Sequence, residues 1–222
     1  SIIIGIILLL LIFKNHISFE NVKSQNFNES NSSNNLIIIA CILLFSMFGL
    51  GLTFQIMQTS IPKLFDIRIE NISTFSIGIT IGFIYGIAGL MTLLGGILAD
   101  HFSLKKIYII GIAAQIPGFF FIAYFTGIPL ILVSLLVAMF NSSILPTENI
   151  LLAKFSPEKH HGLIYGVKFI VAFGSAPIAV FLISKIYELT QEFTYLFNIS
   201  SLMMLLVTLT VFFLPIEKQE YH

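Results

Sequence analysis

Two charged residues, Glu148 and Lys168, stand inside apolar stretches of the sequence. A charge in hydrocarbon is costly, so it usually faces a protein interior or a wet cavity. Glu148 lies ten residues before Glu158 and Lys168 ten residues after it, so a turn centred on Glu158 places both at similar depth. We predict an ion pair, because an unpaired buried charge is too costly. Such a pair can open and close, can hold a proton on Glu148, or can be static packing.

Polar and small residues also recur at helical spacing. One stretch places five residues on a single helical face, at spacings of four, three, four and three: Ser134, Ala138, Asn141, Leu145 and Glu148. Gly51, Gln55 and Gln58 share a face by the same rule. Amides inside a membrane form interhelical hydrogen bonds worth roughly 0.6 kcal/mol each.

Other kinds of chemistry have few candidates. The single cysteine, Cys41, excludes an internal disulfide and a multi-cysteine metal site. His160 and His161 adjoin, but no further ligand has suitable spacing. The sequence contains no G-x-S-x-G, Walker loop or HExxH motif, which argues against a hydrolase and an ATP-driven pump. We therefore expect no enzyme activity, metal or cofactor. The net charge of +0 gives no sign of the positively charged surface that binds nucleic acid.

The elements that position these residues are apolar runs of membrane-spanning length. Hydrophobic residues make up 57% of the chain and charged residues 10%, against roughly 25% charged in soluble domains. Crossing a bilayer takes about 20 apolar residues, and in lipid the backbone must satisfy itself as helices. The predicted fold is an all-α, polytopic membrane bundle with six full spans: Leu36–Met57, Ser76–Leu98, Ile107–Phe125, Pro129–Ile150, Leu163–Ile186 and Phe193–Leu214.

The polar connections divide the chain into four parts. Residues 1–13 form an apolar run of only about 20 Å as a helix, which we interpret as the end of a truncated span. Residues 14–35 are rich in Asn and Ser and are predicted to be a flexible linker. Residues 36–215 make up the six-helix domain, and residues 216–222 a short tail.

The placement of Lys and Arg predicts the orientation. Three of these residues fall on one side of the predicted topology: Lys63, Arg68 and Lys185. Seven fall on the other side: Lys14, Lys23, Lys105, Lys106, Lys154, Lys159 and Lys218. The richer side should be cytoplasmic, which places the linker and the C-terminus in the cytoplasm. We expect a plasma-membrane protein, in the inner membrane if the source is bacterial.

Glycines and prolines mark special points along the spans. A small-residue row permits close helix packing: Gly78, Gly82 and Gly86. Three prolines inside spans should bend or break their helices: Pro117, Pro146 and Pro177. A fourth, Pro62, falls in the stretch Gln58–Phe75, which we predict to be a loop.

The turn between the second and third spans reads GGILADHFSLKK over residues 95–106. Asp100 falls at a helix C-terminus, where the dipole disfavours an anion. We expect it to pair with Lys105, Lys106 or a helix N-terminus. The glycines, Gly96 among them, would let the turn approach another helix closely. The alternative is an ordinary charged interfacial loop.

At this turn the sequence resembles the major facilitator superfamily of secondary transporters. The family's loop signature reads Gly-x-Leu-Ala-Asp-Arg-x-Gly-Arg-Lys, and six residues match it: Gly96, Leu98, Ala99, Asp100, Lys105 and Lys106. Three positions depart from it, with His101, Ser103 and Leu104 in place of basic residues or glycine. The degeneracy is similar to the second copy of the signature, between the family's eighth and ninth helices. The stretch from Leu152-Ala153 to Gly166 also resembles the junction of the family's tenth and eleventh helices.

The resemblance implies what each part does. Residues 36–214 would be helices seven to twelve, residues 14–35 the central linker, and the missing N-terminal six-helix half a partner. It implies alternating access driven by an ion gradient, most simply of protons, with lipid and a small-molecule solute as further partners. Gln55, Gln58 and Asn141 would line the central cavity as solute contacts. Asp100, Lys105 and Lys106 would latch one conformation, and Glu148 would be the coupling carboxylate.

Three other classes of protein remain open. A stand-alone six-helix module would serve as a scaffold or assembly partner, and the severed run at Ser1 argues against it. A channel needs a pore-lining polar helix and a selectivity ring, whereas only scattered amides are present. A membrane enzyme needs a cluster of His, Asp or Glu at the bilayer surface, and the sequence offers only Glu148 and the two loop histidines.

Overall fold

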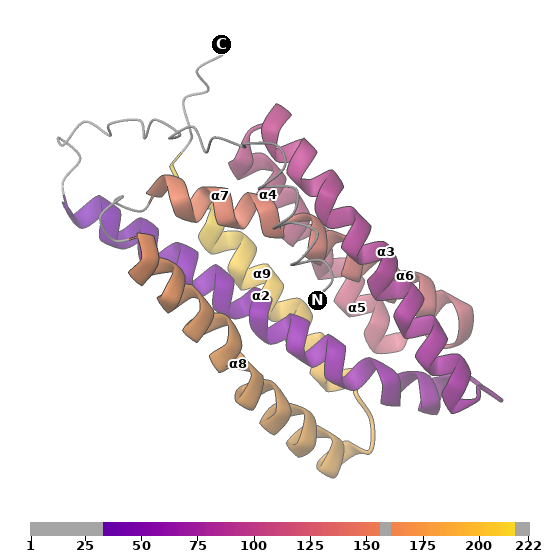
Figure 1. Ribbon diagram of the computed structural model, residues 1–222. Coiled ribbons are helices and arrows are strands. Elements are labelled where there is room, and N and C mark those ends of the chain that lie inside the picture. The colour runs from indigo at the N-terminus through magenta and orange to yellow at the C-terminus, as the bar shows by residue number, and fades with distance from the viewer. Residues whose placement is uncertain (1–32, 156–160, 216–222) are drawn as a thin grey trace. The chain divides into compact units, whose positions relative to one another are not determined.

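The computed structural model of the protein describes residues 33–155 and 161–215 (Figure 1). The predicted truncated helix over 1–13 and the predicted tail over 216–222 lie outside these residues, as does most of the predicted linker over 14–35. The described residues contain helices and turns only. The all-α prediction is confirmed for this part of the chain.

The helices make six membrane spans. Their bounds are α2 Ser33–Arg68, α3 Thr74–His101, α4 Leu104–Ala113, α5 Gln115–Tyr124, α6 Gly127–Ser143, α7 Leu145–Phe155, α8 His161–Thr190 and α9 Thr194–Phe212. Helices α4 and α5 together form one span, and α6 and α7 together form another, so that six apolar segments of 19 to 31 residues are long enough to cross a bilayer. The predicted number of spans is confirmed.

The chain reverses direction at each turn, so the bundle has two ends. We call one the Arg68 end; it carries the turns between α2 and α3, between α5 and α6, and between α8 and α9. The other is the His101 end. Residues with positive φ occur at the Arg68 end, in all three turns: Asn71 at 54°, Gly127 at 60° and Gln191 at 54°. Ser73 starts α3 by accepting a hydrogen bond from the Ser76 amide at 3.1 Å.

The predicted loop over Gln58–Phe75 is wrong in its first half. Helix α2 continues through Pro62 to Arg68, and the turn takes only the residues between Arg68 and Thr74. A proline inside a helix costs about 3 kcal/mol, but this segment buries Ile61, Leu64 and Phe65 almost completely. Tertiary packing of one helical face outweighs the local cost of the proline.

Two other prolines coincide with interruptions. Helix α4 ends at Ala113 and α5 starts at Gln115, two residues before Pro117. Helix α6 ends at Ser143 and α7 starts at Leu145, one residue before Pro146. A proline removes one donor and crowds the carbonyl four residues earlier, so both interruptions have a local cause. Helix α8, in contrast, runs unbroken through Pro177.

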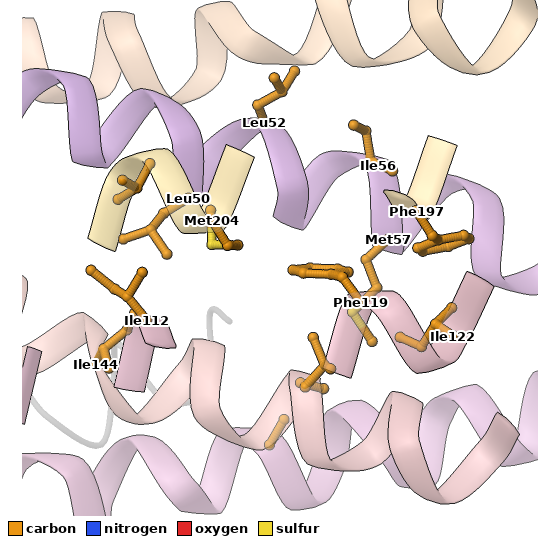
Figure 2. Close-up of a cluster of buried hydrophobic side chains, with 14 of the residues drawn as sticks. Leu50, Leu52, Ile56, Met57, Ile112, Phe119, Ile122, Ile144, Phe197 and Met204 are labelled. Carbon is orange, nitrogen blue, oxygen red and sulfur yellow. The ribbon is translucent and has the colours of Figure 1, made fainter. Parts of the chain in front are cut away.

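Packing is strongest between α2 and α8, between α3 and α6, and between α5 and α9 (Figure 1). Buried side chains from α2, α4, α5 and α9 meet in the core shown in Figure 2, where Leu50, Ile56 and Met57 come from α2 and Phe197 and Met204 from α9. The rings of Phe119 and Phe197 stack with centroids 6.4 Å apart. Through this core, α9 packs against α2 and also against α4 and α5.

Two glycines set the closest approaches near the interruption of α6. A Cβ on Gly95 would lie 1.9 Å from the Ser143 carbonyl oxygen, so only glycine allows α3 to reach the last residue of α6. A Cβ on Gly111 would lie 2.1 Å from Ile144 Cγ2. Helices α3 and α4 therefore both contact the junction between α6 and α7.

Candidate functional site

Glu148 and Lys168 form a buried ion pair. Lys168 Nζ on α8 lies 2.7 Å from Glu148 Oε1 on α7, and the two side chains are only 9% and 5% exposed. Glu148 is in the first turn of α7, where the helix dipole favours a negative charge. The interruption at Ile144 creates this helix start. The pair therefore depends on Pro146 as well as on its own two residues.

Three further polar residues surround this pair. Lys168 Nζ also donates to Asn149 Oδ1. The Tyr108 hydroxyl lies 3.5 Å from Glu148 Oε2 and 3.0 Å from Ser46 Oγ. We call Ser46, Tyr108, Glu148, Asn149 and Lys168 the Glu148 cluster. It joins α2, α4, α7 and α8.

The close contact at Gly111 explains how Tyr108 reaches the cluster. Gly111 meets Ile144, Tyr108 is three residues before Gly111, and Glu148 is four residues after Ile144. Because α4 and α7 run in opposite directions, one helical turn from this contact brings Tyr108 beside Glu148. Tyr108 is fully buried.

The chemistry open to this cluster is proton binding. A buried carboxylate is stable as an anion only while a cation and hydrogen bonds compensate it. If a proton binds Glu148, the carboxyl group becomes neutral and loses its attraction for Lys168. The link between α7 and α8 then weakens without any change in the covalent chain. Static packing of the pair has the same geometry, so an experiment must separate the two roles.

Asn141 lies at the interruptions and is engaged with another amide. Its Nδ2 donates to Gln115 Oε1 at 3.2 Å, and Gln115 Nε2 donates to the Gly111 carbonyl at 3.0 Å. Both side chains are buried. Asn141 thus has the interhelical hydrogen bond that amides commonly make in membranes, and its contact with a solute stays a prediction.

The predicted polar face of residues 134–148 holds only in part. Ser134, Ala138, Asn141 and Glu148 are buried, but Leu145 is 43% exposed. The spacing argument assumes one continuous helix, whereas α6 ends at Ser143 and α7 starts at Leu145. Leu145, the residue that departs from the face, is the first residue of α7.

Gln55 and Gln58 point away from the core. Gln55 is half-buried and Gln58 is exposed, and neither side chain makes a hydrogen bond within residues 33–155 and 161–215. Gly51, on the same face, lies against α8, where a Cβ would be 2.9 Å from the Ala172 carbonyl oxygen. The two glutamines therefore have free amide groups that could hydrogen-bond a solute.

The motif at the His101 end has other partners than expected. Lys105 Nζ donates to the Phe212 carbonyl at 2.8 Å and to the Leu214 carbonyl, so it caps α9. Asp100 is exposed and makes no ion pair with any described residue, and Lys106 is exposed as well. The expected pairing of Asp100 with Lys105 is corrected, because the last carbonyls of a helix lack donors and attract a cation.

The glycines of the motif differ from each other. Gly95 makes the tight contact with Ser143, whereas a Cβ on Gly96 would meet nothing within 4 Å. The same open space surrounds Gly78, Gly82 and Gly86 on α3. The small-residue row is therefore unused in the contacts among the described helices.

Arg68 holds three chain segments together at the other end of the bundle. Its Nη1 donates to the carbonyls of Ile122, Ala123 and Phe125 at 3.2, 2.8 and 3.4 Å. Its Nη2 donates to Glu192 Oε2 at 2.6 Å and to Thr194 Oγ1 at 2.9 Å. We call these six residues the Arg68 joint. It ties the end of α2 to the end of α5 and the start of α9.

Glu192 responds to this environment. Partial burial by itself would raise the pKa of the Glu192 carboxyl. Hydrogen bonds from Arg68 and the Phe193 amide, together with the Arg68 charge, outweigh burial and lower the pKa below its ordinary value of 4.5. The carboxyl is therefore ionised at neutral pH and holds Arg68 firmly.

Two hollows occur elsewhere on the described residues. One, of about 580 Å³, opens beside the Arg68 joint and is lined by Arg68, Glu70, Thr126 and Glu192 among others. The other, of about 170 Å³, is apolar and lies between α5 and α6 near Pro117. Neither is lined by Glu148, Gln55, Gln58 or Asn141. Within the described residues, no group of three or more His, Cys, Asp or Glu could hold a metal ion.

Tyr108, Gln115 and Arg68 were not predicted from the sequence as site residues. Arg68 is the only arginine in the sequence, which is a usable signal. Tyr108 and Gln115 carry no such signal, because their roles depend on contacts across the two helix interruptions.

Comparisons with known proteins agree on one family. The model of the Major Facilitator Superfamily matches residues 36–222. No curated protein sequence matches the chain. A crystal structure of a variant of the E. coli fucose:proton symporter FucP is similar, with a TM-score of 0.74 and 15% identity over 96% of this chain and 53% of that one.

Crystal structures of a peptide transporter, POT, are similar as well. A variant of this transporter in complex with sulfate has a TM-score of 0.69 and 16% identity, over 78% of this chain and 37% of that one. The same values hold for its complex with alafosfalin. At these identities the likeness concerns the fold alone. The chain spans about half or less of the length of these transporters.

Proposed function

The chain belongs to the major facilitator superfamily, and from this premise we propose that it carries out proton-coupled secondary transport of a small solute by alternating access. It acts as a transporter in the plasma membrane, with its C-terminus in the cytoplasm, and not as an enzyme. The observation that carries the proposal is the buried ion pair of Glu148 and Lys168, 2.7 Å apart and joining two helices. The fucose:proton symporter shares this fold.

The proton would act through this pair. Glu148 without a proton binds Lys168 and ties α7 to α8. Glu148 with a proton releases Lys168, so the two helices are free to separate. Each difference of about 1.4 kcal/mol in proton-binding free energy between the two arrangements changes the ratio of their populations tenfold. Proton binding to Glu148 would therefore shift the equilibrium between joined and separated helices. This coupling uses only residues of the described chain.

The six described membrane spans would form the C-terminal half of the transporting unit and work against a second bundle of six spans. Helices α3 and α8 support this part of the proposal, because only 17% of their apolar segments is buried, against 33 to 44% in the other spans. The open glycine row of α3 gives a second bundle room to approach closely. We expect Gly82→Leu to leave the six-helix fold intact and to reduce transport, with Phe83→Leu, at an exposed position next to it, as the matched control.

The free amides of Gln55 and Gln58 would bind the solute between the two bundles. Neither has a hydrogen-bond partner among the described residues, and Gln58 is exposed on the surface of α2. Gln58→Leu should raise the KM for the solute with little change in stability. An unchanged KM in both Gln55→Leu and Gln58→Leu would remove them from the solute site.

A proton-uptake assay tests the transport proposal. Proteoliposomes containing the full-length protein and a lumenal pH-sensitive dye are mixed with fucose or with a peptide, the solutes named for the two similar transporters. We expect one of them to drive proton entry in the wild-type protein and in Glu188→Gln, an exposed surface carboxylate. Glu148→Gln should abolish proton entry. Solute entry with no proton movement in the wild type would contradict coupling.

A further inference from the structure

The Tyr85 hydroxyl on α3 is a buried polar group without a partner. It makes no hydrogen bond with any residue of 33–155 or 161–215. The buried hydroxyls of Ser134 and Thr147 are unpaired as well. A serine or threonine hydroxyl in a helix lies within reach of a carbonyl one turn earlier, so a small rotation can satisfy it. The tyrosine hydroxyl is too far from its own backbone and needs a partner from elsewhere.

A ring contact with α2 does not explain this hydroxyl. The rings of Phe54 and Tyr85 meet edge to face, with centroids 6.4 Å apart and an angle of 77° between their planes. Phenylalanine at position 85 could make the same contact. It would also avoid an unpaired buried hydroxyl, which destabilises the folded state. Such groups are rare in native proteins, and each calls for a reason.

Tyr85 lies at the same level as Gln55 and Gln58. The turn between α2 and α3 is centred on Asn71, with the two glutamines 16 and 13 residues before it and Tyr85 14 residues after it. Helices rise equally per residue, so the three side chains have similar depth. Phe54 shares one side of α2 with both glutamines. Its contact with Tyr85 therefore brings the tyrosine to that side.

The polar groups at this level are uncharged. The two glutamine amides have no hydrogen-bond partner in the described part of the chain. Helix α2 has no charged residue before Lys63, and α3 has none before Asp100. A charged group of a solute would find no counter-charge here. Amides and a phenol both donate and accept, which suits the hydroxyl groups of a solute.

Little covers the Tyr85 ring on α3. The side chain is half-buried, and a Cβ on Gly82 or Gly89, one turn away on either side, would meet nothing within 4 Å. Helix α2 packs far more against α8 than against α3. A solute beside Gln58 can therefore reach the ring, and a rotation of the side chain brings the hydroxyl to it.

We propose that Tyr85 binds the transported solute together with Gln55 and Gln58, and that the solute presents uncharged hydroxyl groups to this half of the transporter, as a sugar or polyol does. The inference rests on the proposed function, in which the two glutamines contact the solute. It adds a third residue, from α3, and the chemical class of the solute. The solute is the hydrogen-bond partner that the Tyr85 hydroxyl lacks within the chain.

Tyr85→Phe in the full-length protein tests the role of the hydroxyl by two measurements. The first is thermal unfolding in nanodiscs without solute, where loss of an unpaired hydroxyl should leave the unfolding temperature unchanged or raise it. The second is uptake into proteoliposomes of labelled fucose, glucose, mannitol and dialanine, a peptide charged at both ends. We expect uptake of at least one of the three uncharged solutes. Its KM should rise about three- to tenfold in Tyr85→Phe, as for one lost hydrogen bond, with the maximal rate kept.

Tyr165→Phe is the matched control. Its side chain is also half-buried, but its hydroxyl donates to the Asn149 carbonyl at 3.1 Å. This variant should show the reverse pattern, with a lower unfolding temperature and an unchanged KM.

Deoxy analogues of the transported solute separate direct contact from an indirect effect. The analogue that lacks the hydroxyl bound by Tyr85 should have a raised KM in the wild type. Tyr85→Phe should not raise that KM further, because the hydrogen bond is already missing. If Tyr85→Phe weakens every analogue by the same factor, Tyr85 does not bind a solute hydroxyl and the inference fails.

Three further results would overturn the inference. A lower unfolding temperature in Tyr85→Phe would mean that the hydroxyl has its partner in the protein, such as the second bundle. An unchanged KM would remove Tyr85 from the solute site. Uptake of dialanine alone, or of none of the four solutes, would remove the solute class.

The proposed function can fail separately. If the KM changes as expected but no proton enters with the solute, the proposed coupling fails and this inference stands. If Tyr85→Phe keeps the wild-type KM while the solute still drives proton entry, this inference fails and the proposed function stands.

Discussion

The Glu148 cluster and the Arg68 joint each contain one cation and one carboxylate, but the two cations have different kinds of hydrogen-bond partner. Each joins one cation to one carboxylate from a different segment of the chain, with Arg68 and Glu192 far apart in the sequence and Glu148 and Lys168 on consecutive helices. Arg68 gives its hydrogen bonds to three backbone carbonyls, a hydroxyl and Glu192. Lys168 bonds only to side chains, Glu148 and Asn149.

This difference would separate a fixed joint from the proposed switch. Backbone carbonyls do not titrate, so protonation of Glu192 would leave most of the bonds of Arg68 in place. The link between α7 and α8 at Lys168 depends on the charge of Glu148. The Glu192 carboxylate is 40% exposed and the Glu148 carboxylate 5% exposed, so water screens the first and not the second. Partners whose charge can change and the low exposure of the carboxylate together support the proposal that the Glu148 cluster is the part that responds to a proton.

Reversing one charge of the buried pair should have the largest effect. Glu148→Lys or Lys168→Glu leaves two like charges in a dry site, and breaking a buried pair costs about 3–5 kcal/mol. We expect both single variants to be recovered poorly as monodisperse protein by size-exclusion chromatography. The double variant Glu148→Lys with Lys168→Glu should regain a large part of the yield. No rescue would mean that the pair does not act as a unit.

Replacing Arg68 by lysine should destabilise the opposite end of the bundle by less. Lysine has three donors for the five acceptors of the joint and cannot reproduce the planar fork of arginine. We expect a loss of about 2 kcal/mol in unfolding in mild detergent, with transport and its pH dependence kept. Lys63→Met, which removes an exposed pair with Asp66, should leave stability almost unchanged. A changed pH profile in Arg68→Lys would end the distinction between joint and switch.

The loop motif at the His101 end gives a third, smaller effect. Lys105 bonds the last carbonyls of α9, so Lys105→Met should lower stability by about 1 kcal/mol. Asp100→Asn should have almost no effect on stability, because Asp100 has no ion pair among the described residues. Equal losses in both variants, measured by thermal unfolding, would restore the expected pairing of Asp100 with Lys105.

The smallest effect concerns the pH dependence of stability at Glu192. Its pKa is lower in the folded protein than the ordinary 4.5, so the unfolded state takes up its proton first as pH falls. The stabilisation is full above pH 4.5 and is lost as pH falls through the folded-state value. Glu192→Gln should lower the unfolding temperature near neutral pH, and its difference from the wild type should shrink as pH falls below 4.5. A difference that stays constant through the acid range would contradict this assignment.

The sequence predicts the spans well because their signal is local. Apolar runs of the required length can only be helices in lipid, and the six spans are found. The ion pair of Glu148 and Lys168 could be predicted from their equal spacing about Glu158 for a similar reason. Two helices joined by one turn rise equally per residue, so residues equally far from the turn lie at the same depth.

The parts that the sequence does not predict depend on contacts between helices. Pro62 sits in a helix and Pro146 at an interruption, and only the packing of Ile61, Leu64 and Phe65 accounts for the first. Leu145, the first residue after the interruption at Ile144, lies at the surface, and Tyr108 lies beside Glu148 through the contact of Gly111 with Ile144. A fixed helical period carries no information on such contacts between helices.

The most direct test of the account compares accumulation with exchange in Glu148→Gln. Glutamine keeps the size of the protonated carboxyl and cannot release a proton. Proteoliposomes of the full-length variant should exchange labelled solute across the membrane at equal pH but fail to accumulate it when a pH gradient is imposed, whereas the wild type does both. Accumulation driven by the pH gradient in Glu148→Gln would show that Glu148 does not carry the coupled proton.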